Sequence, residues 1–159
     1  MKFLKTIRFD SSDTHVFESA AAPDEWAVPG GLAFADDRED SLTGKRKQAF
    51  SNGFLSLVDF GYSTFVSVAE IDQTTIDDQV EGLATHFVSH FGAPSADAAR
   101  PAAQAEINFV LDMCAGTPLN SVFTLRRFFD DDGEMREEFR IVDAPGAKPH
   151  TRVWEVVED

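Results

Sequence analysis

Two histidines four residues apart, His86 and His90, are the residues whose types and spacing most directly suggest chemistry. On an α-helix this spacing presents both imidazoles on one side, where they could bind one metal ion. A zinc site needs a third ligand, and Phe87 stands where the His-Glu-x-x-His signature has its glutamate. The alternative is a pair of ordinary boundary residues beside an apolar stripe. Metal analysis of the purified protein distinguishes the two.

The densest positive charge in the chain is the run Lys45-Arg46-Lys47. It is not a phosphate-binding loop, because Glu39 occupies the position of the first glycine and Arg46 that of the serine or threonine. The run could hold an anion or an acidic segment of a partner. It could equally be a solvated turn.

Several arginines belong to the C-terminal third of the chain, where glutamates are close in sequence. Cross-strand ion pairs on a solvent-exposed sheet face would explain this pattern. A sheet face that binds carboxylates is the alternative. The arginines are Arg126, Arg127, Arg136, Arg140 and Arg152, and the glutamates are Glu137, Glu138 and Glu155.

Other kinds of chemistry find little support. The chain has no Gly-x-Ser-x-Gly elbow, and its single cysteine, Cys114, lies on the apolar side of an expected helix, where a thiol is inert. The acidic run from Asp130 to Glu134 lacks the alternating pattern of a calcium loop, since position 128 is Phe128. We therefore expect a hairpin tip there, no intrachain disulfide and no cofactor.

The charge balance restricts the choice of partner. With 14 basic and 28 acidic residues the net charge is −14, which disfavours nucleic acids and anionic membranes. An acidic surface favours solubility, and it could also attract a cationic partner. The N-terminal segment lacks the apolar run of a signal peptide, and no stretch approaches a membrane span, so we expect a cytoplasmic protein.

The expected framework is built on the apolar stretch Phe54–Ile71, which is rich in residues that favour strands. We expect a central hairpin there, covered on both faces or covered on one face and joined to a second copy on the other. Apolar residues at helical spacing predict helices at about 75–91 and 101–115. Thr74 or Thr75 would begin the first helix, and Pro101 would lie in the first turn of the second.

The remainder of the chain predicts a three-stranded meander over about 121–157, with Asp132-Gly133 in its first turn. The order of a β-rich part, two consecutive helices and a second β-rich part indicates an α+β fold with a mostly antiparallel sheet. The length of 159 residues suits a single domain over residues 1–159.

Three motifs, MKFLKTIRFDSSDTHVFE, EWAVPGGLAFAD and GKRKQAFSNGFL, resemble a small family of uncharacterised single-domain proteins from alphaproteobacteria. The resemblance covers most of the chain. Its motifs carry no catalytic residues, and it implies no assigned activity. It also implies a link to maturation factors of molybdenum-dependent formate dehydrogenases, and hence to metalloenzyme maturation.

Two hypotheses for the function follow. The first is a non-enzymatic accessory protein that binds another protein through its acidic face and sheet edges, with a homodimer as a further possibility. The second is a small-molecule or metal site, or an enzyme site, in the groove between helices and sheet. That site would use His86, His90 and either Glu70 or Glu81.

Overall fold

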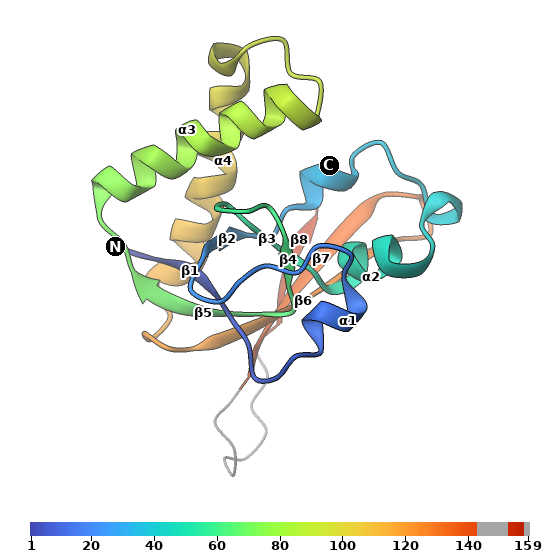
Figure 1. Ribbon diagram of the computed structural model, residues 1–159, viewed down its shortest axis with the longest axis horizontal. Helices are drawn as coiled ribbons and strands as arrows, with labels where there is room; N and C mark the ends of the chain where they lie inside the picture. The colour runs from blue at the N-terminus through green and yellow to red at the C-terminus, as the bar shows by residue number, and fades with distance from the viewer. Residues whose placement is uncertain (143–152, 158–159) are drawn as a thin grey trace.

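The β-prone runs of the chain form one antiparallel sheet. The computed structural model describes residues 1–142 and 153–157, and within them eight strands lie in the order β4-β3-β2-β1-β5-β6-β7-β8 (Figure 1). The α+β class with a mostly antiparallel sheet is confirmed. The strands are β1 (Lys2–Ile7), β2 (Trp26–Val28), β3 (Phe54–Ser56), β4 (Tyr62–Ser63), β5 (Phe65–Glu70), β6 (Val122–Phe129), β7 (Met135–Val142) and β8 (Val153–Val157).

The C-terminal meander is confirmed. β6 pairs with β7 from Val122–Val142 to Phe129–Met135, and β7 pairs in turn with β8. The turn between β6 and β7 is closed by the Asp130 side chain, which accepts hydrogen bonds from the backbone N–H groups of Asp132 at 2.9 Å and Glu134 at 3.0 Å. Its acidic residues are thus a hairpin tip, as expected.

The stretch Phe54–Ile71 forms three strands rather than one central hairpin. β3 and β4 pair in a short hairpin at the edge of the sheet, whereas β5 lies in the middle, between β1 and β6. The break before β5 is at Thr64, whose backbone N–H and hydroxyl both donate to the Asp13 carboxylate, at 3.2 and 2.6 Å. The mid-sheet position therefore applies to the second half of the stretch only.

The two expected helices are present as α3 (Gln73–His90) and α4 (Ala96–Ala115), and they pack against each other. Asp72 caps α3 by accepting from the Thr75 N–H at 2.8 Å. α4 begins before Pro101, because Ser95 caps it by accepting from the Ala98 N–H at 3.1 Å. Pro101 lies inside the helix, so its expected place in the first turn is wrong.

Shorter helices fill the N-terminal third. They are α1 (Asp13–Val16), α2 (Gly44–Asn52) and two 3₁₀ turns, η1 (Gly31–Phe34) and η2 (Glu39–Ser41). α2 packs on β6, and around Phe34 and Phe50 it forms a second, smaller apolar cluster. Figure 1 shows α3 and α4 together on one side of the molecule and α1 and α2 on the other.

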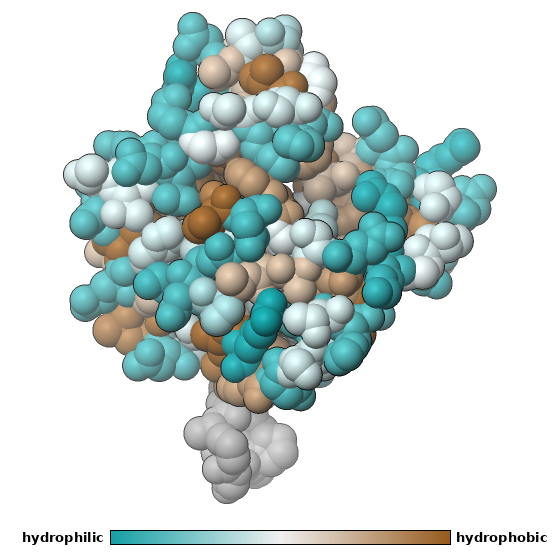
Figure 2. Space-filling model, viewed as in Figure 1, coloured by the Kyte–Doolittle hydropathy of each residue, from teal (hydrophilic) through white to brown (hydrophobic). Residues whose placement is uncertain are grey.

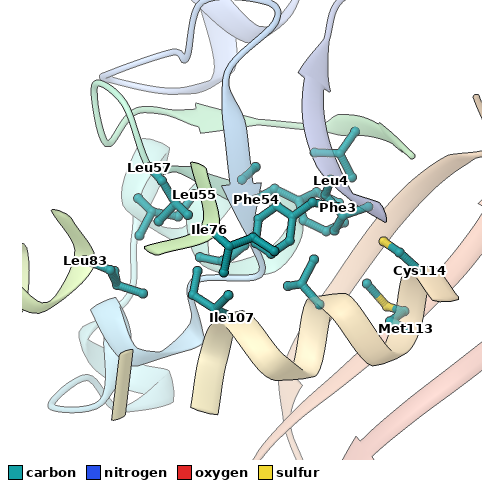
Figure 3. Packing of buried hydrophobic residues seen from close by; sticks show 14 of the residues in the cluster. Phe3, Leu4, Phe54, Leu55, Leu57, Ile76, Leu83, Ile107, Met113 and Cys114 are labelled. Atoms are coloured by element: carbon teal, nitrogen blue, oxygen red, sulfur yellow. The ribbon is translucent and has the colours of Figure 1, made fainter. Parts of the chain in front are cut away.

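The main core joins the sheet to α3 and α4. Register places Leu4 beside Val68 and Leu125 beside Phe139, and all four side chains are buried. Figure 3 shows Ile107 and Met113 of α4 among the core side chains. Among the described residues, no helix combines the length and the apolar character needed to cross a bilayer.

Candidate functional site

The C-terminal end of α3 holds the two histidines in a column of rings. His86 and His90 stack with their ring centroids 4.3 Å apart. On its other side His86 stacks on Phe60 at 3.7 Å with an interplanar angle of 1°, and Phe91 meets it edge-on at 5.0 Å. Phe60 has a φ of 58°, a conformation uncommon for a side chain of this size. The strained loop between β3 and β4 is thus packed onto α3.

This environment changes the acid–base state of His86. Burial, with a smaller contribution from the neighbouring His90, lowers the pKa of His86 to about 4, so its imidazole is neutral at pH 7. A neutral imidazole is the form that binds metals. Within residues 1–142, however, no group of three or more potential ligands (His, Cys, Asp or Glu) comes together. Metal binding by this pair stays a prediction.

The glutamates of the second hypothesis do not join the histidines. Glu81 accepts two hydrogen bonds from Arg100 of α4, at 2.6 and 3.1 Å, and this pair lowers the pKa of Glu81. Glu70 lies before α3, and with Lys2 and Asp112 it lines an open groove of about 750 Å³. The rise of α3 separates that end from His86 by about 20 Å.

A second groove lies beside the histidine column. It has a volume of about 310 Å³ and is bounded by the ends of α3 and α4 and by η1. Figure 2 shows the surface hollowed between the end of the α3–α4 hairpin and the neighbouring segment. Apart from the backbone of Gly92, its lining is formed by apolar side chains: Leu32, Ala35, Phe87, Phe91, Ala93, Ala98, Ala99 and Ala102.

Acidic side chains flank this apolar groove. Asp36, which follows the lining residue Ala35, is exposed, as are Arg38 and Glu39 shortly after it. Asp97 is exposed at the start of α4, where it pairs with Arg100 at 2.7 Å. Leu32 and Phe91, at 39% and 37% exposure, are large apolar side chains left open to solvent at its walls. The groove is therefore an apolar surface with an acidic surround.

The basic run at the start of α2 does not form one patch. Arg46 pairs with Asp37, and its guanidinium lies 4.9 Å from the ring centre of Phe34. Lys45 and Lys47 are exposed and make no hydrogen bond or ion pair with the described residues. Anion binding by Lys45, Arg46 and Lys47 stays a prediction. Arg46 is the least suited of the three, because its charge is already paired with Asp37.

The expectation that the arginines of the meander lie on a solvent-exposed sheet face is wrong for Arg127. Its side chain is fully buried, and its guanidinium donates to Glu137 at 2.8 Å and to the carbonyls of Pro29 and Phe50 at 2.6 and 2.7 Å. The reason is register, because Arg127 and Glu137 continue the row of buried Leu125 and Phe139. An alternating strand directs every second residue inward whatever its type.

Three other arginines of the meander lie on the opposite face. Arg126 binds Glu138 through two hydrogen bonds of 2.9 and 3.1 Å, as expected for a cross-strand pair. Arg136 binds Asp130 at 2.6 Å. Arg140 lines a hollow beside Arg126, and Arg152 lies outside the described residues.

Burial also shifts the pKa values of a thiol and of a carboxyl group elsewhere in the molecule. Cys114 is buried, as expected, and burial raises the pKa of its thiol to about 12. Sequence reasoning missed the carboxyl pair of Glu25 and Asp59, which both accept from the Ala22 N–H, at 3.1 and 3.4 Å. Burial and the adjacent Asp59 raise the pKa of Glu25. No sequence pattern links two acids so far apart in the chain.

Comparison with known proteins identifies the family of this chain. A family model described as a family of unknown function (DUF6505) matches residues 1–153. The chain belongs to this family. Neither the search of curated proteins nor the search of solved structures finds a match. The expected membership of an uncharacterised family is thereby confirmed, and DUF6505 is described as a family of unknown function.

Proposed function

We propose that this DUF6505 protein is an interaction domain that docks an amphipathic segment of another protein in the groove between η1 and the α3–α4 hairpin. The observation that carries the proposal is the apolar lining of that groove, with Leu32 and Phe91 exposed at its walls. Isolated exposed apolar residues are ordinary, but a concave set of them is typical of a helix-binding groove.

The form of the groove suits a helix. Ala98 and Ala102 lie one turn apart on α4 and both line the groove. Small side chains at this spacing let a second helix approach closely. The acidic surround, with Asp36 and Glu39 exposed nearby, favours an apolar segment with basic residues at its edges.

The test compares two arginine substitutions on the same helix. Ala102→Arg fills the groove, whereas Ala105→Arg adds the same side chain at another exposed position of α4 outside the groove lining. We expect proteins captured from a lysate of source cells by the wild type and by Ala105→Arg to be lost with Ala102→Arg. A synthetic peptide of the captured segment should then bind with the same order of affinities.

Two results would count against this proposal. If every specifically captured protein binds Ala102→Arg as well as it binds the wild type, the groove is not the docking site. If the protein occupying the groove is a second copy of this chain, light scattering will show a dimer that Ala102→Arg dissociates, and the partner is then a homodimer subunit. The resemblance to proteins linked with metalloenzyme maturation names one class of partner to test by direct binding.

A second candidate function is metal binding at His86 and His90, which the neutral state of His86 supports. Isothermal titration with zinc and nickel should then show stoichiometric binding that His86→Ala and His90→Ala each remove. Equal binding by wild type and the double variant would exclude it.

A further inference from the structure

Among the described residues, polar side chains occupy one face of the sheet across β6 and β7. Register places Thr124 beside Arg140 and Arg126 beside Glu138, on the face opposite the buried Leu125. All four polar side chains are exposed or half-buried. This face is therefore open to ligands, whereas the opposite face belongs to the core.

A hollow of about 250 Å³ lies on this open face. The β5–β6 pairing comprises Val66–Phe123 and Ser67–Val122, and beyond it the carbonyl of Leu125 accepts instead from the Asn52 side chain at 3.1 Å. The hollow thus lies where Asn52 takes the place of a neighbouring strand. Its polar lining consists of Asn52, Thr64, Thr124, Arg126, Glu138 and Arg140.

The charges in the hollow are not balanced. Glu138 is engaged by Arg126 through both carboxylate oxygens, at 2.9 and 3.1 Å. Arg126 lowers the pKa of Glu138 through this contact, and the charge of Arg140, on the other side of Glu138, adds to the effect. Among the described lining residues, two guanidinium groups thus accompany one carboxylate, on a chain whose net charge is −14.

We propose that this hollow binds a carboxylate ligand, with the Arg140 guanidinium and the Thr124 hydroxyl as donors. A guanidinium presents paired N–H groups that match the two oxygens of a carboxylate. The same face already holds one carboxylate in this way, that of Glu138 on Arg126. The site is separate from the apolar groove and does not depend on the function proposed for it.

Size and charge narrow the ligand class. A water molecule occupies about 30 Å³ of liquid, so the hollow holds about eight waters or one acid group with a short body. A singly charged carboxylate meets less long-range repulsion from the acidic chain than a doubly charged phosphate does. The ligand is therefore a small carboxylic acid or the carboxylate of a partner's side chain or C-terminus.

The experiment is an NMR titration with acetate, succinate and inorganic phosphate at constant ionic strength. We expect saturable shifts for succinate at the Arg140 side-chain Nε–H and at the Thr124 amide. Arg140→Gln should weaken succinate binding by about tenfold or more, since a hydrogen bond to a charged group contributes about 1.5–3 kcal/mol. Arg140→Lys, which keeps the charge without the paired donors, should restore the affinity only in part.

Arg38→Gln provides the matched control, because it removes the same guanidinium charge from an exposed position outside the lining of the hollow. It should leave succinate affinity within about twofold of the wild type. An equal loss in Arg38→Gln and Arg140→Gln, or shifts that never saturate, would overturn the proposal. Tighter binding of phosphate than of succinate would overturn the assignment to carboxylates. Acetylated peptides ending in a free or an amidated C-terminus then distinguish a partner's terminus from a free acid.

Discussion

The ring column at the end of α3 gives His86 an unusual protonation state. Its pKa of about 4 lies below the ordinary value of 6.5, because burial between Phe60 and His90 disfavours the charged imidazole. Between these two values the unfolded chain takes up a proton that the folded chain does not. His86 therefore reduces stability as the pH falls from about 6.5 toward 4, and it has no such effect above that range.

We predict that His86→Phe, which keeps an aromatic ring in the stack, makes stability less dependent on pH. Between pH 7 and pH 5 the free energy of unfolding should fall less than in the wild type, by on the order of 1 kcal/mol after allowance for solvent screening. Urea denaturation at a series of pH values measures this difference. His15→Gln, at an exposed position in α1, is the control and should follow the wild type. Parallel curves for all three proteins would contradict the prediction.

At the scale of secondary-structure elements, Arg127 connects β6 by hydrogen bonds to three other parts of the fold. From β6 it reaches Glu137 on β7, the carbonyl of Phe50 in α2 and the carbonyl of Pro29 after β2. Gly31 lies close by, and a Cβ there would come within 3.4 Å of the Arg127 side chain. The chain thus leaves space for this guanidinium, and each of its three nitrogen atoms donates to a protein oxygen.

We predict that Arg127→Met destabilises the protein by about 3–5 kcal/mol, because it leaves Glu137 and two carbonyls without their donor. The double variant Arg127→Met/Glu137→Leu should be more stable than Arg127→Met alone, since it also removes the uncompensated charge. Thermal and chemical denaturation measure both.

The neighbouring pair supplies the control for this prediction. Arg126 and Glu138 form the same kind of ion pair on the open face, with side chains 61% and 25% exposed. Arg126→Met should cost less than about 1 kcal/mol. Similar losses at Arg126 and Arg127 would show that burial does not decide the contribution of these pairs.

At the scale of the whole molecule, the excess of acidic residues is the dominant property. A net charge of −14 on a chain of 159 residues produces repulsion among surface carboxylates. Surface ion pairs, such as Arg100 with Glu81, neutralise part of this repulsion. The rest is open to screening by salt.

We predict that salt stabilises the protein by screening this repulsion. The Debye length falls from about 30 Å at 0.01 M to about 8 Å at 0.15 M. A gain of about 1 kcal/mol over this range corresponds to a rise in melting temperature of about 2–4 °C. Calorimetry in sodium chloride measures the shift, and potassium chloride should give the same one if screening is the cause. A melting temperature that stays constant or falls with salt would contradict the prediction.

Local sequence patterns were sufficient for α3 and for the β6–β7 hairpin. The spacing of Ile76, Val80 and Leu83 predicts α3, and the Asp132-Gly133 turn between two apolar runs predicts the β6–β7 hairpin. The same patterns predict a buried Cys114 and hence an inert thiol. Propensity and periodicity act over a few residues, so no knowledge of the tertiary structure is needed for them.

The sequence by itself therefore determined the α+β class, the acidic surface and the absence of familiar catalytic motifs. Only the tertiary structure decided that β5 rather than a whole hairpin lies mid-sheet, and that Arg127 is buried while Arg126 and Arg140 face outward. It also brought Phe60 onto His86 and η1 alongside the α3–α4 hairpin. The physical reason is that strand register and long-range packing determine which face of each strand is buried. The residues adjacent in sequence do not determine this.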